Sequence, residues 1–384
     1  MSFGRREDVV IVGGGPAGAA AACILASAER PVLLIERDAE PRHKVCGEFL
    51  SIEAQTYLAH LGIDLDALGA SRISRLRLVR ERKLTEVGLP FTARGLSRRV
   101  LDEALLQRAH SQGARIIRGE AVRSISAGPS LVRIDTDARQ PVSADAVFLA
   151  TGKHDVRGVK RVSAGSMRDL IGFKLHYRLM GQQQQALDGA VEVILFAGGY
   201  VGLQMVEQGI ANLCLVVSRQ RFEQVGKSWD GLLDWIGGEC SHVVERLHDA
   251  EPLYGRPLSI FQIPYGFLHA PDPDEPHGLF RLGDQVGVIP SFTGEGLSIA
   301  LHSGCLAAST YLAHGRASPL FHHRIRCDIH RSLRLASALN RIARHPAGQQ
   351  AIFHLFRIWP AAMRHAAILT RLQEASVHRA LLAS

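Results

Sequence analysis

The chain has 384 residues, of which 46% are hydrophobic and 21% charged, so its composition is that of an ordinary globular protein of one large domain or two interlocked ones. Its six cysteines form no C-x-x-C pair, which argues against a disulfide scaffold and favours a reducing cytoplasm. No apolar run reaches the ~18 residues that a membrane-spanning helix needs. Residues 1–8 are not followed by the apolar core of a signal peptide, so we expect a cytoplasmic protein.

The positive charge is concentrated at one end of the chain. Residues 305–384 contain 11 Arg, no Lys and two acids, a net charge of +9, whereas the other 304 residues carry a net charge of −1. A local basic face is therefore predicted, and nucleic acid is not expected as a partner.

The first elements form a β-α-β unit. Residues 8–13 (DVVIVG) read as a strand buried on both faces, residues 16–28 as an Ala-rich helix, and residues 31–36 (PVLLIE) as a second buried strand. Together they span the ~30 residues usual for such a unit.

The expected secondary structure changes twice along the rest of the chain. A helix is expected at 97–112 and a buried strand at 144–152; strand-like stretches joined by Gly-rich loops follow from 168 to 264. A strand at 278–283 then leads to a helix at 296–311, and the last ~70 residues read as helices broken near Pro346 and Pro360.

This order predicts an α/β fold: a Rossmann-type, glutathione-reductase-like dinucleotide-binding domain with an inserted β-rich substrate domain and a helical C-terminal cap. We assign 1–70, 95–165 and 276–314 to the discontinuous binding domain, 71–94 and 166–275 to the substrate domain, and 315–384 to the C-terminal helical segment.

The glycine motif between the first strand and helix carries the strongest signal. Gly13, Gly15 and Gly18 give G-x-G-x-x-G, in which the glycines allow the tight turn, the approach of a pyrophosphate and close helix–strand packing. The helix N-terminus favours phosphates. Glu36 ends the second strand, where a carboxylate accepts hydrogen bonds from ribose hydroxyls and repels a 2′-phosphate.

Two later features favour FAD over NAD at this site. Leu282-Gly283-Asp284 follows a strand and offers a carboxylate for the ribityl chain. The turn from Pro290 to Leu297 enters a helix, whose N-terminal N–H groups suit the negative charge that reduction places on a flavin. The expected cofactor-binding residues are Gly13, Gly15, Pro16, Ala17, Gly18, Glu36, Arg37, Arg98, Val122, Thr151, Gly152, Asp284, Pro290, Gly294, Glu295, Gly296 and Leu297.

These motifs resemble those of the flavoprotein superfamily that contains para-hydroxybenzoate-hydroxylase-type monooxygenases, flavin halogenases and geranylgeranyl reductases. The resemblance covers most of residues 8–312 and is closest to the reductase branch. Residues 44–47 (KVCG) resemble its K-x-C-G segment, and residues 98–102 (RRVLD) its R-x-x-F-D helix start, whose Arg reaches FAD. Residues 293–296 match its T-G-E-G turn, and residues 196–203 (FAGGYVGL) resemble its substrate-pocket segment.

The departures from these families leave the reaction open. Val201 to Gln204 replace the Trp and Phe-Pro of the reductase pocket, and Glu48 stands where the reductases have a second glycine. Residues 150–152 (ATG) replace the Asp-Gly motif of the hydroxylases. The W-x-W-x-I-P signature of the halogenases is absent because Trp229 and Trp235 are six residues apart, so halogenation is not favoured.

Cys46 is the candidate catalytic residue. The resemblance to the reductases places its thiol near the flavin or substrate, and Lys44 and His43 could lower its pKa; the alternative is a small buried hydrophobe. We predict no metal site, since His323, Cys327 and His330 share a helical face that is rich in Arg rather than in further ligands.

The substrate site is expected between the inserted sheet and the C-terminal helices, at the flavin face. Its expected lining is Phe173, His176, Tyr200, Gln204, Phe261 and Phe292. We see no second dinucleotide motif, so NADH or NADPH would dock only transiently as the reductant.

Three functions are compatible with these motifs. The leading hypothesis is an FAD-dependent monooxygenase that hydroxylates or epoxidises a lipophilic, aromatic or other small molecule. The second is a reductase of isoprenoid double bonds, and the third is a membrane-associated flavoprotein with little turnover. The basic C-terminal helices either form a packed cap with a solvated Arg face or contact the inner face of the membrane peripherally.

Overall fold

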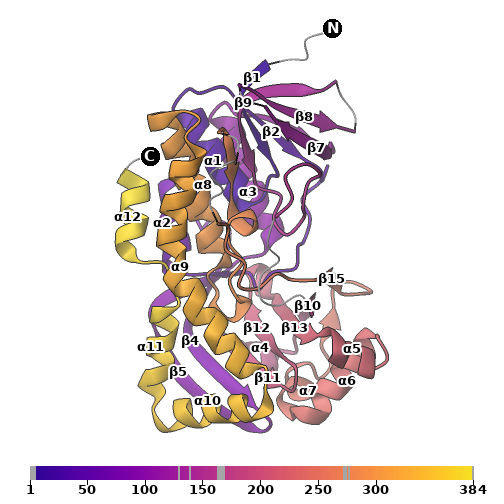
Figure 1. Ribbon diagram of the computed structural model, residues 1–384. Helices are drawn as coiled ribbons and strands as arrows, with labels where there is room; N and C mark the ends of the chain where they lie inside the picture. The colour runs from indigo at the N-terminus through magenta and orange to yellow at the C-terminus, as the bar shows by residue number, and fades with distance from the viewer. Residues whose placement is uncertain are drawn as a thin grey trace.

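The computed structural model describes residues 6–128, 130–137, 140–161, 169–270, 275 and 277–382. Two sheets lie one above the other, and the C-terminal helices run along one side of both (Figure 1). This is the α/β architecture that the sequence predicts. The expected domain boundaries at residues 165, 166 and 276 lie outside the described residues.

The first sheet has the order β6-β2-β1-β9-β8-β7, with β16 beside β9. Strands β6, β2, β1, β9 and β16 are parallel neighbours, and β7 and β8 add an antiparallel meander. The bounds are β1 (Arg6–Val12), β2 (Val32–Glu36), β6 (Arg115–Arg118), β7 (Val122–Ala127), β8 (Val132–Thr136), β9 (Val142–Leu149) and β16 (Leu279–Arg281). The apolar run of β1 is buried on both faces, as parallel strands require.

Helices cover one face of this sheet and form its core with it. They are α1 (Pro16–Ser27), α2 (Ile52–His60), α3 (Arg98–Ser111) and α8 (Gly296–His314). Alanines make α1 narrow enough to pack closely against α8, where a Cβ at Gly304 would lie 2.2 Å from the Ala17 carbonyl oxygen. This packing brings the N-termini of α1 and α8 to the same edge of the sheet, beside the glycine turn.

The second sheet has the order β14-β10-β13-β12-β11-β4-β5-β3, with β15 on β10. The bounds are β3 (Phe49–Leu50), β4 (Ser71–Arg80), β5 (Lys83–Gly95), β10 (Leu170–Arg178), β11 (Gly189–Phe196), β12 (Gly199–Met205), β13 (Ala211–Ser218), β14 (Glu251–Pro252) and β15 (Leu258–Phe261). Strands from residues 71–95 therefore pair directly with strands from residues 170–218, through β4 and β11.

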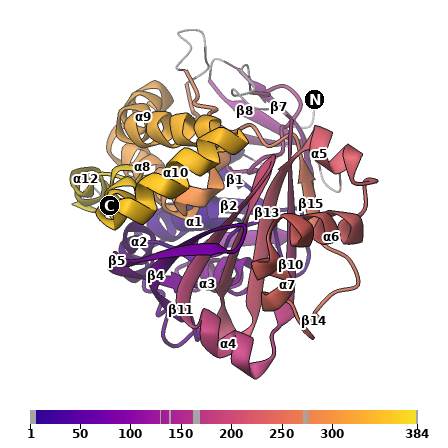
Figure 2. The ribbon, with the colours of Figure 1, turned by 90° about the horizontal axis from the view of Figure 1, so that it is seen from below.

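The two faces of the second sheet have different covers (Figure 2). On one face Phe222 of α5 (Arg219–Gln224) and Trp229 and Trp235 of α6 (Trp229–Glu239) pack over β10, β12 and β13. The helix α7 (Ser241–Arg246) adds Val243 to the same cluster. The helix α4 (Gly181–Leu187) precedes β11. The opposite face packs against Phe353 and Met363 of the C-terminal helices.

The C-terminal helices are α9 (Ser318–Ala343), α10 (Pro346–Ile358), α11 (Pro360–Leu369) and α12 (Glu374–Leu382). Breaks fall directly before Pro346 and Pro360, because proline cannot continue a helix but suits its first turn. No helix among the described residues is both long enough and apolar enough to cross a membrane.

Candidate active site

A glycine turn joins β1 to α1. Gly13 adopts φ +107°, and a Cβ there would lie 2.5 Å from the Ala150 carbonyl oxygen. A Cβ at Gly18 would lie 2.0 Å from the Gly13 carbonyl oxygen, whereas Gly15 has no backbone within 4 Å. Gly13 and Gly18 thus allow the close packing of the turn, and Gly15 leaves room on its open side.

A cavity opens beside this turn, and we call it the glycine-loop cavity. The N-termini of α1 and α8 both face it, so backbone N–H groups and two positive helix ends point into one space. Nine of the predicted cofactor-binding residues line it: Gly15, Pro16, Ala17, Arg98, Gly152, Asp284, Gly294, Gly296 and Leu297. Cys46 also lies on its wall.

Two ion pairs flank the glycine-loop cavity. The Arg98 guanidinium donates to both oxygens of Asp102, at 2.7 and 2.8 Å. Lys153 Nζ donates to Asp284 Oδ2 at 2.9 Å; although burial favours its neutral form, the Asp284 carboxylate raises the pKa of Lys153. Sequence reasoning missed Lys153, although it directly follows the predicted Thr151-Gly152 turn. It is a cation at the cavity wall, beside the acid expected to hold the ribityl chain.

The other predicted cofactor residues lie outside this cavity. The Glu36 carboxylate borders a small hollow next to Gly14, whose backbone N–H donates to Oε2 at 2.5 Å. Arg37 contacts His154, and Thr151 donates to the His154 carbonyl. The remaining predicted residues that do not line the cavity are Gly13, Gly18, Val122, Pro290 and Glu295.

Glu295 points toward the C-terminal helices rather than into the glycine-loop cavity. Its carboxylate accepts from the Leu372 backbone N–H at 3.4 Å and lies 3.5 Å from the Arg371 guanidinium. Burial raises the pKa of Glu295 to about 7; the Glu53 carboxylate adds to this increase and Arg371 opposes it. The predicted flavin turn is therefore tied to the loop between α11 and α12.

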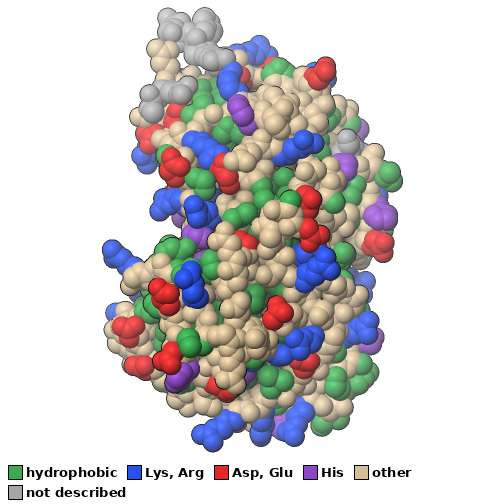
Figure 3. Space-filling view, turned by 180° about the vertical axis from the view of Figure 1, so that it is seen from behind, with side chains coloured by type: hydrophobic (Ala, Val, Ile, Leu, Met, Phe, Trp, Pro, Cys, Tyr) green, Lys and Arg blue, Asp and Glu red, His purple; other side chains and the backbone are tan. Residues whose placement is uncertain are grey.

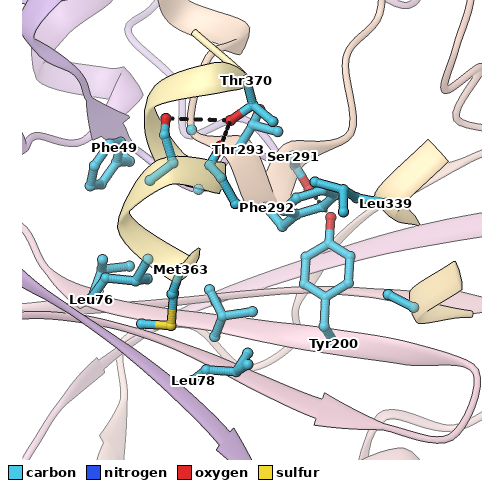
Figure 4. A pocket seen from close by; sticks show the side chains of 18 of the residues that line it. Phe49, Leu76, Leu78, Tyr200, Ser291, Phe292, Thr293, Leu339, Met363 and Thr370 are labelled. Atoms are coloured by element: carbon cyan, nitrogen blue, oxygen red, sulfur yellow. Dashed lines mark hydrogen bonds between the residues drawn. The ribbon is translucent and has the colours of Figure 1, made fainter. Parts of the chain in front are cut away.

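A second cavity of about 180 Å³ lies between the second sheet and the C-terminal helices, and we call it the apolar cavity. In Figure 4, Leu76, Leu78 and Met363 lie on one side of it, and Phe292 and Thr293 on the other. This is where the sequence places the substrate site. Tyr200, Gln204 and Phe292, three of the six residues expected there, line it.

The two cavities share part of their walls. Five residues line both: Gly47, Phe49, Cys214, Ser291 and Gly294. Gly294 adopts φ +71°, and a Cβ there would lie 2.5 Å from the Phe49 ring, so only glycine fits without displacing the ring. This junction is where a molecule in the apolar cavity comes nearest to the contents of the glycine-loop cavity.

Three hydroxyl groups meet at this junction. The Tyr200 hydroxyl lies 2.5 Å from Ser291 Oγ, and the Tyr265 hydroxyl donates to the same Oγ at 2.6 Å (Figure 4 shows the Tyr200 contact). Burial raises the pKa of Tyr200 well above its ordinary value and also raises that of Tyr265, so both phenols are protonated near neutral pH. They can donate hydrogen bonds or protons but do not act as bases at rest.

The other three expected substrate residues lie elsewhere. Phe173 is on the opposite face of β10, packed against Phe222 and Trp229, because side chains alternate along a strand. His176 shares the face of β10 that is turned toward the junction but is buried against Glu48. Phe261 lies on the edge strand β15 with its side chain 59% exposed.

The segment from Lys44 to Glu48 is held by side chains of the second sheet. Lys174 donates to the Lys44 carbonyl at 3.2 Å, and Asn212 Nδ2 donates to the carbonyls of Cys46 and Gly47 at 3.1 and 2.9 Å. Gln204 Nε2 donates to the Glu48 carbonyl at 2.9 Å. The second sheet therefore fixes the wall residues Cys46 and Gly47, and Gln204 serves the backbone as well as the apolar cavity.

The Glu48 carboxylate is buried at the centre of the contacts that hold residues 44–48. It accepts from Lys174 Nζ, from His176 Nε2 at 2.7 Å and from the Arg98 backbone N–H at 2.7 Å. Although burial opposes ionisation, Lys174 and His176 lower the pKa of Glu48. His43, Glu48 and His176 are close enough together to hold a metal ion, but the Lys174 ammonium on the same carboxylate disfavours a second cation.

A second group with metal-like geometry lies away from both cavities. His269, Glu275 and His322 converge, but Arg281 donates from its side chain to Glu275 at 2.8 Å and from its backbone N–H to His322 Nε2 at 3.1 Å. His269 Nε2 lies 2.9 Å from the other Glu275 oxygen. Hydrogen bonds within the protein account for this group.

Comparison with known proteins decides the family. Residues 7–208, more than half of the chain, match the pyridine nucleotide-disulphide oxidoreductase family. The chain belongs to this family. No curated protein matches it. It is an FAD-dependent oxidoreductase, as the sequence predicts, whereas its place in the geranylgeranyl reductase branch stays a prediction.

Solved structures show the same fold. The flavin-dependent brominase Bmp2, as a triple mutant, is 16% identical and superposes with a TM-score of 0.76, covering 98% of each chain. The myxobacterial chondrochloren halogenase CndH is 17% identical, with a TM-score of 0.74 and coverage of 99% of this chain and 97% of that one. The halogenase PltM, crystallised with phloroglucinol and FAD, is 14% identical, with a TM-score of 0.74 and coverage of 98% and 91%.

The residues around the glycine-loop cavity fit FAD. The N–H groups at the start of α1 suit the pyrophosphate, with Arg98 beside them, and Asp284 with Lys153 suits the ribityl chain. The start of α8, at Gly296 and Leu297, suits the ring end that becomes negative on reduction. In this oxidoreductase the junction with the apolar cavity therefore lies on the α8 side, beside Gly294.

Proposed function

We propose that this FAD-dependent oxidoreductase is a monooxygenase that hydroxylates or epoxidises a small lipophilic molecule carrying a hydroxyl group. Bound FAD supplies the redox and oxygen chemistry. A nicotinamide donor provides two electrons; one atom of O₂ enters the substrate and the other leaves as water. The observation that carries the proposal is the apolar cavity that meets the glycine-loop cavity at a wall bearing three hydroxyls.

The size of the apolar cavity favours a compact substrate. Its volume is about 180 Å³, slightly larger than the ~150 Å³ cavity of a well-studied engineered lysozyme that takes up benzene. A molecule of about one aromatic ring fits such a space. The lining is mostly aliphatic and aromatic, so the substrate would be held by apolar contact and shielded from water.

Tyr200 and Ser291 would orient the substrate. Both line the apolar cavity at the junction, and their hydroxyls are hydrogen-bonded to one another. Because the phenol of Tyr200 stays protonated, it can donate to a substrate oxygen and pass a proton along Ser291 and Tyr265. This would place the substrate ring beside Gly294.

Oxygen uptake tests this proposal. The protein, loaded with FAD and supplied with NADH or NADPH, would be screened against phenols and other one-ring compounds. We expect uptake that depends on the compound and matches oxygenated product mole for mole. Tyr200→Phe should retain FAD and lower this turnover by roughly ten- to a hundredfold. Tyr311→Phe, on α8 and packed against Phe148 and Phe280, serves as the control and should not change it.

A reductase of isoprenoid double bonds is the second candidate, because Cys46 lies on the wall of the glycine-loop cavity. If the protein is a reductase, a prenyl lipid added under anaerobic conditions should reoxidise the photoreduced flavin and be converted to a product with one double bond saturated. Cys46→Ser should slow this step. That result, without compound-dependent oxygen uptake, would replace the monooxygenase. Halogenation is not proposed because the fold alone is shared with the halogenases and the tryptophan signature is absent.

A further inference from the structure

The bend between α10 and α11 exposes large apolar side chains. Ile358, the last residue of α10, is 82% exposed, and Trp359, which joins the two helices, is 57% exposed. Leu355, one turn before Ile358 on α10, is 49% exposed. We call Leu355, Ile358 and Trp359 the apolar elbow. The two helices lie at the lower end and along the lower left of Figure 1.

The helices that carry the elbow are apolar on two sides. Their inner side places Ile352, Phe356 and Met363 on the wall of the apolar cavity, which accounts for part of their hydrophobicity. The elbow residues are exposed to solvent, and the cavity does not account for their hydrophobicity. Large exposed apolar groups that cluster at one place mark an interaction surface.

The charges on the helices that carry the elbow have one sign. No Asp or Glu occurs from residue 329 to residue 373, a stretch that contains seven Arg. Acids from other elements reach two of these: Asp169 pairs with Arg344, and Glu53 and Glu295 pair with Arg371. Among the described residues no ion pair involves the other five, which are Arg331, Arg334, Arg341, Arg357 and Arg364.

On the face seen from behind (Figure 3), Lys and Arg side chains are interspersed with Asp and Glu. Arg357 and Arg364 flank the elbow within one or two helical turns, so the apolar tip is bordered by unpaired cations. Tryptophan and large aliphatic groups next to Arg are typical of helices that lie in the interface of an anionic membrane.

We propose that the apolar elbow docks this protein peripherally on an anionic phospholipid bilayer, with Ile358 and Trp359 in the acyl boundary and Arg357 and Arg364 at the headgroups. The docked helices would be the ones that wall the apolar cavity, so the cavity would lie next to the bilayer. This proposal does not depend on the reaction catalysed.

Vesicle flotation of the full-length, FAD-loaded protein tests the docking. We expect binding to vesicles of phosphatidylglycerol and phosphatidylcholine at 0.1 M salt, little binding to phosphatidylcholine alone, and a severalfold loss at 0.5 M salt. The double variant Ile358→Ser and Trp359→Ser should lower the affinity roughly tenfold or more while retaining FAD. Arg357→Glu with Arg364→Glu should abolish the preference for the anionic lipid.

A matched control separates docking from general stickiness. Val244→Ser removes an aliphatic side chain that is 54% exposed on α7, on the other side of the second sheet, and should leave vesicle binding unchanged. Brominated lipids should quench part of the tryptophan fluorescence of the native protein but not that of Trp359→Phe.

Three outcomes would overturn the proposal. The first is the absence of anionic-vesicle binding by the native protein. The second is equal binding by the double serine variant. The third is a concentration-dependent dimer that the double serine variant loses, which would make the elbow a contact between copies of this chain. Because none of these measurements uses turnover, failure of the docking leaves the proposed reaction untouched.

Discussion

The two cavities that meet at Gly294 are built in different ways. The glycine-loop cavity is shaped mainly by backbone: glycine turns, the first turns of α1 and α8, and two ion pairs at its rim. The apolar cavity is shaped by side chains from six strands and three C-terminal helices. Backbone geometry tolerates almost no substitution, whereas a side-chain wall can be repacked. Substitutions in the glycine-loop cavity should therefore abolish FAD binding, whereas substitutions in the apolar cavity should change substrate selectivity.

Gly18→Val should have the largest effect on the glycine-loop cavity. Even the first added carbon would lie 2.0 Å from the Gly13 carbonyl oxygen and 3.0 Å from Ile11, so the turn must open. We expect a loss of at least about 3 kcal/mol of stability and no FAD after purification, measured by absorbance and thermal unfolding. Gly238→Ala is the control, since a Cβ there meets nothing within 4 Å. Retention of FAD by Gly18→Val would contradict the backbone account of this cavity.

Glu48→Gln should come next. It leaves the buried Lys174 ammonium without its carboxylate, a change that costs about 3–5 kcal/mol when an ion pair is buried. We also expect a weaker FAD affinity, because the Glu48 carboxylate holds the Arg98 backbone N–H and also Lys174, which donates to the Lys44 carbonyl. Denaturant unfolding and FAD titration measure the two effects. Glu223→Gln, in an exposed pair with Arg219, should change neither stability nor FAD affinity. An equally small effect of Glu48→Gln would contradict the role of Glu48 in holding residues 44–48.

Glu295 should make stability depend on pH in the neutral range. Its pKa is about 7 when folded, against an ordinary 4.5, so folding binds a proton between these values. The contribution of Glu295 to the free energy of unfolding is therefore greatest below about pH 4.5 and is lost as the pH rises through about 7. Glu295→Gln should remove that slope and stabilise the protein at pH 8 relative to the native chain, by on the order of 2–3 kcal/mol.

Unfolding midpoints at pH 5, 6, 7 and 8 would show this difference. Glu374→Gln, an exposed carboxylate on α12, should follow the native curve throughout. Parallel curves for Glu295→Gln and the native protein would mean that Glu295 is ionised at pH 6.

Ala367→Phe should give the smallest change in stability and should act on substrate alone. Ala367 lies on the wall of the apolar cavity, and the added ring would occupy part of its 180 Å³. We expect full FAD content and a KM for the one-ring substrate raised roughly tenfold, since one ring-sized contact contributes ~1.5 kcal/mol or more. Ala351→Phe, exposed on α10, is the control. Loss of FAD in Ala367→Phe would show that the two cavities are not separable.

The same contrast explains which features could be predicted from sequence. The turn at Gly13–Gly18 and the α8 start are local, and the spacing of their glycines is enough to place them. Strand β10 is buried on both faces, so its letters LIGFKLHYR do not alternate and cannot show which residues face the junction. The structure turns Lys174 toward the junction and Phe173 away from it. The role of Glu48 could not be predicted because the two side chains that pair with its carboxylate, Lys174 and His176, lie more than 120 residues away.

The anchoring of residues 44–48 by the second sheet also sets an order of events during synthesis. The side chains that hold this segment are on β10, β12 and β13 and follow it by between 126 and 166 residues. At the usual pace of a ribosome, the segment waits on the order of ten seconds for its last partner. The Rossmann turn emerges first but cannot have a complete cofactor wall during that time. We therefore expect FAD to bind only after β13 has left the exit tunnel. The cofactor would then bind to a fold in which the two sheets are already in contact.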